Sequence, residues 1–295
     1  MKLISYRKSD QKKIGTVGAD GRIADVTPVV NGGGMISLIE NYADIEEKIA
    51  GLESTDQLSD VNLLPPVERP GKIICLAGNY RAHITESGYV EPEKRANFTQ
   101  QLFLKPSTSL TGHGSEIVLG SQNVKVGWET ELAVVIGKGG KNIAVENALD
   151  HVFGYTILND LSERGLNSRI ENRHKREMDG FCDWLAGKWF DGFAPCGPVL
   201  VTKDEIPDPS DLEIKFYLNG DLRQHGNTRD MIFDISEQIA YASSIMTLES
   251  GDIISTGTPA GAGLGDKSTS LKDGDELVCE IERVGSLKNT VRCLH

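Results

Sequence analysis

The alternation of apolar and polar positions divides the chain into a short first part and a longer second part. Three short segments of the first part have strand patterns: residues 3–7, 13–18 and 19–27. Residues 35–52 place apolar side chains at helical spacing. Three prolines within residues 63–70 exclude a helix or a central strand there. We therefore predict a small N-terminal α+β domain over residues 1–66 and a larger domain over residues 67–295.

In the larger domain, predicted strands outnumber predicted helices. Apolar runs typical of strands occupy residues 72–80, 128–137, 151–160, 194–202, 212–220, 252–257 and 276–285. Helical patterns occupy residues 144–152, about 163–185 and 234–248. The polar stretch 81–101 predicts a surface helix with a loop, or a mobile flap. Because strands and helices do not alternate regularly, the pattern favours a β-rich α+β fold over a doubly wound parallel fold.

Composition and charge narrow the classes of partner. The net charge of −12 disfavours nucleic acid, which a negative surface repels, and leaves a small anionic substrate possible. No apolar run of about 18 residues predicts a membrane span, and the N-terminus lacks a signal-peptide pattern, so we expect a cytoplasmic protein. The five cysteines are scattered without a C-x-x-C pair, which predicts free thiols and argues against zinc.

Acidic residues stand at the edges of two predicted core strands. Glu129 and Glu131 precede an apolar run, and residues two apart in a strand share one face. Two such carboxylates commonly mark only a solvated strand end. Asp160 ends the next apolar strand. If the three converge, their repulsion favours a hard divalent cation, Mg²⁺, Mn²⁺ or Ca²⁺, with about three coordination positions left for substrate and water.

Seven segments between about residues 72 and 265 together resemble the fumarylacetoacetate hydrolase family. They are KIICLAGNYRAHITE, LFLKPSTSLTGHGSEI, WETELAVVIG, GYTILNDLSER, GKWFDGFAPCGPVLVT, RQHGNTRDMIF and MTLESGDIISTGTPAGAG. The resemblance implies a catalytic domain of mixed β-sheets rolled into a barrel-like body, and a homodimer. It also implies a Mg²⁺ or Mn²⁺ site at Glu129, Glu131 and Asp160, and substrates that are 1,3-dicarbonyl or 2-oxo acids.

The resemblance also implies a catalytic base. His83 and Glu86 lie three residues apart, so on a helix they are neighbours, and a carboxylate beside imidazole orients it and raises its basicity. In isolation this spacing is more typical of an incidental surface pair, but the family has this pair where water is activated. We expect the polar residues 84–100 to form a lid over bound substrate. Lys188 matches a family lysine that stabilises an enolate.

Further candidates concern substrate binding. Lys105 is a weaker candidate of the same kind as Lys188, and Arg164 and Thr258 are expected to bind a substrate carboxylate. Asn167 is a further candidate, because relatives commonly have at this position a glutamine that contacts substrate or the catalytic water. The shorter asparagine, and Gly165 where relatives have an acid, put the substrate specificity in doubt. The sequence assigns no role to the charged residues of the long segment 163–187.

These observations predict a metal-dependent hydrolase that cleaves a carbon–carbon bond in acylpyruvates such as fumarylpyruvate. The same site chemistry also permits decarboxylation of a 2-oxo acid, isomerisation of a 2-hydroxydienoate and dehydration of a 2-keto-3-deoxy acid. A binding module without catalysis is a further alternative, which the retention of both the acidic residues and His83 disfavours.

Overall fold

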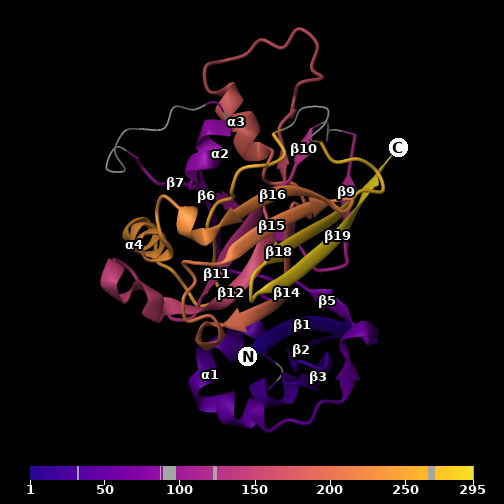
Figure 1. The fold of residues 1–295 in the computed structure, drawn as a ribbon, viewed down its shortest axis with the longest axis vertical. Helices are drawn as coiled ribbons and strands as arrows, with labels where there is room; N and C mark the ends of the chain where they lie inside the picture. Colours follow the sequence, from indigo (N-terminus) through magenta and orange to yellow (C-terminus); the bar gives the residue numbers. More distant parts are fainter. Residues whose placement is uncertain (32, 87, 89–97, 122–124, 265–269, 295) are drawn as a thin grey trace.

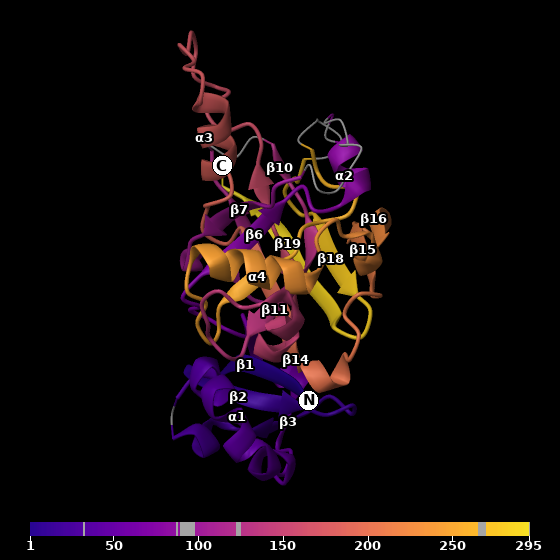
Figure 2. The same ribbon diagram turned by 90° about the vertical axis from the view of Figure 1, so that its left-hand side faces the viewer.

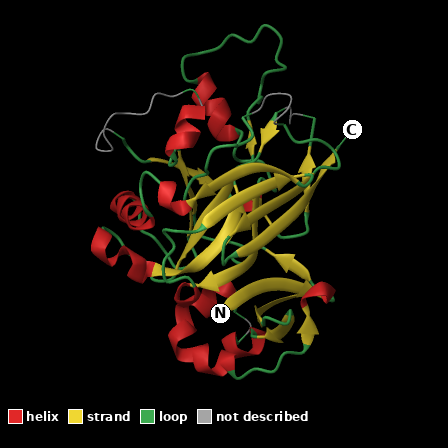
Figure 3. Cartoon of the chain, viewed as in Figure 1, coloured by secondary structure: helices red, strands yellow, loops and turns green. Residues whose placement is uncertain are grey.

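The computed structural model describes residues 1–294 except 32, 87, 89–97, 122–124 and 265–269, and these residues form two large sheets and one small sheet (Figures 1 and 3). The strands of the first sheet are β1 (Lys2–Lys8), β2 (Gln11–Val17), β3 (Arg22–Asp25), β4 (Asp56–Gln57), β5 (Asn62–Leu64), β6 (Ile73–Ala77), β7 (Gln101–Lys105), β8 (Leu110–Thr111), β11 (Thr130–Ile136), β12 (Val152–Asn159), β14 (Ala194–Thr202) and β17 (Ile253–Ser255). Their order is β4-β3-β2-β1-β14-β12-β11-β17-β6-β7, with β5 beside β1 and β8 beside β14.

The second sheet has five strands, β9 (Glu116–Leu119), β15 (Glu213–Leu218), β16 (Asp221–Asn227), β18 (Glu276–Ile281) and β19 (Gly285–Cys293), in the order β16-β15-β18-β19-β9. Two short strands, β10 (Val126–Gly127) and β13 (Ser162–Glu163), pair with each other. The helices are α1 (Met35–Ala50), α2 (Arg81–Glu86), α3 (Asp179–Ala186) and α4 (Ile235–Ile245). This architecture confirms the predicted β-rich α+β class.

The N-terminal residues extend the first sheet instead of standing apart from it. β1 pairs antiparallel with β14, with Leu3 opposite Leu200. Side chains of α1 and of β1, including Leu38 and Ile49, share one apolar core with central strands of the sheet. The division at residue 66 stays a prediction. Figures 1 and 2 place this region at the end of the molecule opposite α2 and α3.

The central strands are buried on both faces. Every residue of β11 and of β12 is buried, which explains why their sequences are continuous apolar runs without alternation. Along β11, Leu132 and Val134 join one apolar core, whereas Ala133 and Val135 join the other. The five-stranded sheet covers the first of these faces, where Trp128 stacks on Phe216 at 5.1 Å. Polar groups at the ends of β11 and β12 therefore lie at the edge of a dry interior.

Several predicted elements differ from the structure. Residues 145–151 form a 3-10 helix instead of an α-helix, and within 163–185 only α3 is helical. Charged and other polar residues fill most of that segment, and without an apolar stripe a helix has nothing to bury. The strands β7, β9, β16 and β19 were not predicted. Exposed apolar side chains at Leu104, Val118 and Leu222 interrupt the alternation in the first three, so sheet pairing defines these strands more than their sequence does. Among the described residues, no helix is long and apolar enough to cross a membrane.

Candidate active site

The three predicted metal ligands come together where β11 begins and β12 ends. The two strands pair antiparallel with Thr130 opposite Asn159, so the residues just outside this pair lie side by side. The backbone N–H of Asp160 donates to the carbonyl of Glu129 at 2.8 Å. Glu129, Glu131 and Asp160 are buried, and each offers a carboxylate oxygen within 4.8 Å of the others. We call these three residues the carboxylate cluster.

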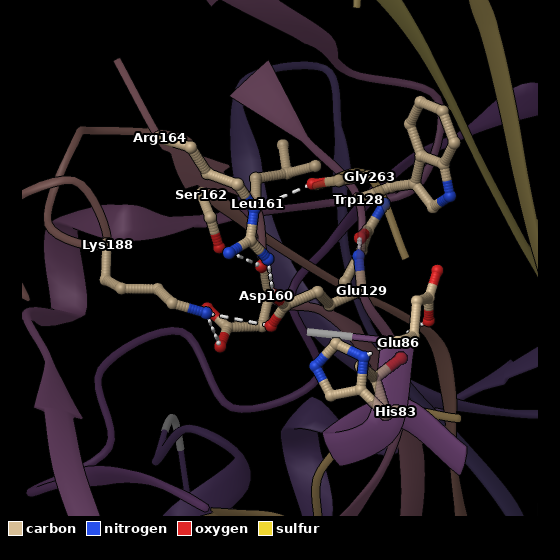
Figure 4. A network of polar contacts seen from close by, with 12 residues as sticks. His83, Glu86, Trp128, Glu129, Asp160, Leu161, Ser162, Arg164, Lys188 and Gly263 are labelled. Carbon is tan, nitrogen blue, oxygen red and sulfur yellow. Dashed lines mark hydrogen bonds and ion pairs between the residues drawn. The ribbon is translucent and has the colours of Figure 1, made fainter. Parts of the chain in front are cut away.

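Three cationic side chains contact the carboxylate cluster, and Figure 4 shows two of them, Lys188 and Arg164. Lys188 Nζ donates to Glu129 Oε2 at 2.8 Å and to Asp160 Oδ2 at 2.7 Å. Lys105 Nζ donates to the other oxygen of Asp160 at 2.6 Å, and Arg164 pairs with the other oxygen of Glu129. Both lysines are at most 3% exposed, so water screens these pairs little. The formal charges of the three cations and the three carboxylates balance.

The surroundings of Glu129 and Glu131 shift the pKa values of these two carboxylates in opposite directions. Burial raises the pKa of Glu129, but the charges of Lys188 and Arg164 outweigh burial and lower this pKa to about 2. For Glu131, burial and the nearby carboxylates of Asp160 and Glu129 act together and raise the pKa well above its usual range. Glu131 is therefore the member of the carboxylate cluster whose charge most lacks a positive neighbour.

The donor set of the carboxylate cluster fits a hard divalent cation. All three ligands are carboxylates, and oxygen ligation suits Mg²⁺, Mn²⁺ or Ca²⁺. One oxygen of Glu131 accepts hydrogen bonds from Ser255 Oγ at 2.6 Å and from the Gly257 N–H at 2.9 Å, which fixes the orientation of this carboxylate. Such support of a ligand by a further layer of hydrogen bonds is typical of metal sites. Glu129, Glu131 and Asp160 are thus the residues that would hold the cation.

The predicted His–Glu pair lies on α2, next to the carboxylate cluster. His83 Nδ1 is 3.6 Å from Glu86 Oε2, which is an ion-pair distance and longer than a hydrogen bond. Figure 4 shows the His83 ring beside Glu129, and the charge of His83 also contributes to the lowered pKa of Glu129. The side chain of His83 is 12% exposed. A base at this position is shielded from bulk water and faces the place where a metal-bound substrate would lie.

One loop contacts each part of this site. Residues 256–263, which we call the TGTPAG loop, follow β17. The N–H of Gly257 donates to Glu131, and the N–H of Gly261 donates to Glu86 Oε2 at 2.8 Å. The carbonyl of Gly263 accepts Arg164 Nε at 2.7 Å. The TGTPAG loop therefore links the carboxylate cluster, the His–Glu pair and the arginine.

Two further predicted substrate contacts are engaged within the protein. Asn167 Nδ2 donates to Asp183 Oδ1 at 2.7 Å, and Arg173 holds both oxygens of the same Asp183 carboxylate. The Thr258 hydroxyl donates to the Thr130 carbonyl at 2.9 Å. Contacts of Asn167 and Thr258 with substrate stay predictions. The predicted lid over residues 84–100 falls largely outside the described residues, because residues 87 and 89–97 are among those not described.

The structure adds aromatic and hydroxyl groups that the sequence did not single out. Lys188 Nζ lies 5.1 Å from the ring centre of Phe103 and 5.7 Å from that of Trp184, so two aromatic faces support its charge. Phe103 precedes Lys105 by two residues in β7, and this spacing was a usable signal that both face the site. Ser255 had no comparable signal, because only the pairing of β17 with β11 brings it to Glu131.

Comparisons with known proteins agree with this geometry. A family model for the C-terminal part of fumarylacetoacetate hydrolase matches residues 72–292. The human mitochondrial oxaloacetate tautomerase FAHD2A is 42% identical over 234 residues, which cover 79% of this chain and 70% of that protein. A crystal structure of maleylpyruvate hydrolase from Sphingobium sp. SYK-6, in complex with manganese(II) and pyruvate, superimposes with a TM-score of 0.80 at 34% identity over the full length of both chains.

An isomerase of known structure is similar too. The 5-carboxymethyl-2-hydroxymuconate delta-isomerase of Mycobacterium smegmatis matches over the full length of both chains, with a TM-score of 0.75 and 31% identity. The predicted mixed-sheet body with a small N-terminal region is therefore the fold of these enzymes, and a metal site at the carboxylate cluster accords with the manganese in the hydrolase crystal. The relatives differ in reaction and agree in family: this chain belongs to the fumarylacetoacetate hydrolase family of enzymes.

Proposed function

We propose that this protein is a divalent-metal-dependent hydrolase that cleaves the carbon–carbon bond of acylpyruvates, a class of 1,3-diketo acids. The observation that carries the proposal is the position of the His83–Glu86 pair beside the carboxylate cluster. A histidine oriented by a carboxylate is the usual arrangement for deprotonating water. The similar maleylpyruvate hydrolase was crystallised with pyruvate, which is the 2-oxo acid that hydrolysis of an acylpyruvate releases.

Each residue of the site has a separate role in the proposed reaction. A divalent cation held by Glu129, Glu131 and Asp160 would supply Lewis acidity toward the 2-oxo acid. His83, oriented by Glu86, takes a proton from water, and the water oxygen attacks the carbonyl carbon remote from the acid. The bond between this carbon and the methylene carbon breaks, and its electron pair passes to the methylene. The ammonium of Lys188 stabilises that negative charge until a proton is taken up, which leaves a carboxylic acid and a 2-oxo acid.

Tautomerisation of oxaloacetate is the second candidate, because the human relative with 42% identity carries that name. It needs only proton transfer to and from a carbon next to a carbonyl, and it needs no attacking water. Decarboxylation, isomerisation of a hydroxydienoate and dehydration of a deoxy sugar acid use the same site and differ in what leaves. A homodimeric state stays a prediction.

A substrate panel separates these reactions. Metal-stripped protein is supplied with Mn²⁺ and tested on fumarylpyruvate, acetylpyruvate, oxaloacetate and a 2-keto-3-deoxy acid. The variant His83→Ala is compared with His151→Ala, since His151 bonds the backbone carbonyl of Lys138 and is remote from the site. Metal-dependent cleavage of an acylpyruvate that His83→Ala loses and His151→Ala keeps is the expected result.

Two results contradict the hydrolase proposal. Turnover of oxaloacetate without cleavage of either acylpyruvate replaces it with the tautomerase or, where CO2 is released, the decarboxylase. Cleavage that survives in His83→Ala removes His83 as the base and with it the observation on which the proposal rests.

A further inference from the structure

Gln224 is the single buried side chain of β16, and its amide connects two parts of the site. Its oxygen accepts the N–H of Thr130 at 3.0 Å. Its nitrogen donates to Thr258 Oγ1 at 2.8 Å and to the carbonyl of Pro259 at 2.9 Å. Thr130 stands between the two glutamates of the carboxylate cluster, and the other two partners belong to the TGTPAG loop. One amide therefore bonds both the ligand-bearing strand and the loop.

The backbones of β16 and of the TGTPAG loop also touch directly. A Cβ atom added to Gly226 of β16 would lie 2.4 Å from the Cβ of Pro259. A Cβ added to Gly261 would lie 2.0 Å from the carbonyl oxygen of Arg223, and Gly261 has a φ of +88° that favours glycine. Backbone therefore meets backbone at Gly261, and the Pro259 ring packs directly on the backbone of β16 at Gly226, so a shift of β16 displaces the loop.

The loop in turn holds the chemical groups. Its Gly257 N–H fixes the carboxylate of Glu131, and its Gly261 N–H fixes that of Glu86. Both amides belong to a segment with no regular secondary structure, which has no ladder of its own to keep them in place. Backbone hydrogen bonds hold the two ends of the loop, because the Thr256 N–H donates to the Leu132 carbonyl and the Gly263 N–H to the Trp128 carbonyl, both at 3.0 Å. Between these ends, Trp128 Nε1 donates to the Gly261 carbonyl, and Gln224 donates two hydrogen bonds to the loop.

We infer that Gln224 is a positioning residue of the active site. It fixes the TGTPAG loop against the ligand-bearing strand and so sets the placement of Glu86, and through it of His83, relative to the carboxylate cluster. Gln224 does not contact substrate. Its amide is required because a hydrocarbon side chain would leave the Thr130 N–H and the loop acceptors without partners in a buried place. The kinetic part of this inference rests on the proposed function.

A buried glutamine could instead serve only to fill the core, and the chain offers a matched control. Gln238 of α4 is equally buried, and its amide nitrogen donates to the carbonyl of Phe233 at 2.9 Å, outside the TGTPAG loop. The loss of stability that follows from truncating any buried glutamine should appear in both Gln224→Ala and Gln238→Ala. A change in loop exchange, Mn²⁺ affinity and kcat should appear only in Gln224→Ala.

The experiment compares Gln224→Ala, Gln224→Glu and Gln238→Ala in the full-length protein. Amide hydrogen exchange is measured for peptides that cover the TGTPAG loop, and the affinity for Mn²⁺ is measured by titration. Activity on the accepted acylpyruvate is measured in each variant, with and without Glu86→Gln. We expect Gln224→Ala to speed exchange in the loop, weaken Mn²⁺ binding and lower kcat about 10- to 100-fold, with a smaller change in KM.

The remaining variants sharpen the comparison. Gln238→Ala should leave loop exchange, Mn²⁺ affinity and kcat at wild-type values while lowering the Tm. Gln224→Glu keeps an oxygen for Thr130 and loses a donor, so its loop exchange should fall between wild type and Gln224→Ala; it also carries the comparison if the alanine variant does not fold. In the Glu86→Gln background the kcat effect of Gln224→Ala should largely disappear, because both changes act through one pair.

Loop exchange and Mn²⁺ affinity that stay at wild-type values in both Gln224 variants would overturn the inference. Equal responses to Gln224→Ala and Gln238→Ala would also overturn it, since they indicate a core-filling role. If no substrate is turned over but loop exchange and Mn²⁺ binding respond to position 224 alone, the proposed function fails and the positioning role stands.

Discussion

Removing one carboxylate from the carboxylate cluster should abolish the response of the protein to metal without weakening the metal-free fold. Glu131→Gln is the sharpest change, because an amide has nearly the same shape and still offers an oxygen to Ser255 and Gly257. Glu131 is buried among like charges that raise its pKa. An amide there removes the repulsion from Glu129 and Asp160, so the metal-free variant should unfold at or above the temperature of the wild type.

The size of the metal response follows from linkage. A cation that binds only the native state stabilises it by about 2.7 kcal/mol at a concentration of 100 Kd. With an unfolding entropy of about 2.1 cal/mol/K per residue, the 295 residues give about 0.6 kcal/mol/K, so the Tm should rise by about 4 °C. If loss of one charged ligand weakens binding about 100-fold, the same concentration gives about 0.4 kcal/mol and a shift below about 1 °C.

The assay is thermal unfolding of metal-stripped protein with and without Mn²⁺. Asp252→Asn is the control, because Asp252 is a fully buried carboxylate that bonds Lys72 and the N–H of Glu249, away from the carboxylate cluster. This control should lower the Tm and leave the increase caused by Mn²⁺ intact. The reasoning is refuted if Mn²⁺ does not stabilise the wild type, or if Glu131→Gln responds to Mn²⁺ as the wild type does.

Three further outcomes are expected. Lys188→Met removes a buried cation from two carboxylates. In urea unfolding of the metal-free protein, this change should lower the free energy of unfolding by about 3–5 kcal/mol. A loss below about 1 kcal/mol would contradict the buried pairing. Gly127→Ala places a Cβ 1.7 Å from the Gly263 carbonyl oxygen of the TGTPAG loop and should lower both Tm and activity. Gly180→Ala in α3, where a Cβ meets no other part of the described chain within 4 Å, should leave both unchanged; equal effects would contradict the steric argument. Burial opposes ionisation of Asp25, but hydrogen bonds from Lys13 and a neighbouring threonine outweigh burial and lower the pKa of Asp25. The ionised carboxylate therefore stabilises the fold above its unfolded pKa, and this contribution is lost as the pH falls through its folded pKa. Between about pH 6 and pH 3, the Tm should fall less in Asp25→Asn than in the wild type; identical profiles would contradict this linkage.

The pattern of apolar residues along the chain was sufficient to predict a strand where that strand buries most of its side chains. β11 and β12 were predicted because continuous apolar runs mark strands that are covered on both faces. It failed for β16, whose seven residues include one buried side chain, the polar Gln224. A strand of this kind is defined by its neighbour in the sheet and carries no periodic signal. The charged segment before α3 also lacks an apolar stripe, which is why it forms no helix although a helical pattern was predicted there.

For the site, the sequence supplied the residue types and the structure supplied their pairing. The i, i+2 spacing of Glu129 and Glu131 and the terminal position of Asp160 could be read directly, and the family resemblance joined them with His83. Which cation contacts which carboxylate could not be read. Lys188 bridges two members of the carboxylate cluster from 59 and 28 residues away, and no local rule relates such positions.

By itself, the sequence thus determined a β-rich chain with carboxylates at the edges of two core strands, because these depend on periodicity and on residue chemistry. The family resemblance joined the carboxylates into one metal site and predicted His83 as the base, which stays a prediction. Only the tertiary structure decided that Gln224, 94 residues from Thr130, supports the strand between the ligands, and that the TGTPAG loop bonds both Glu86 and Glu131. These contacts depend on strand order and register across two sheets. They are fixed by the packing of the whole chain, which has no counterpart in the spacing of residues along it.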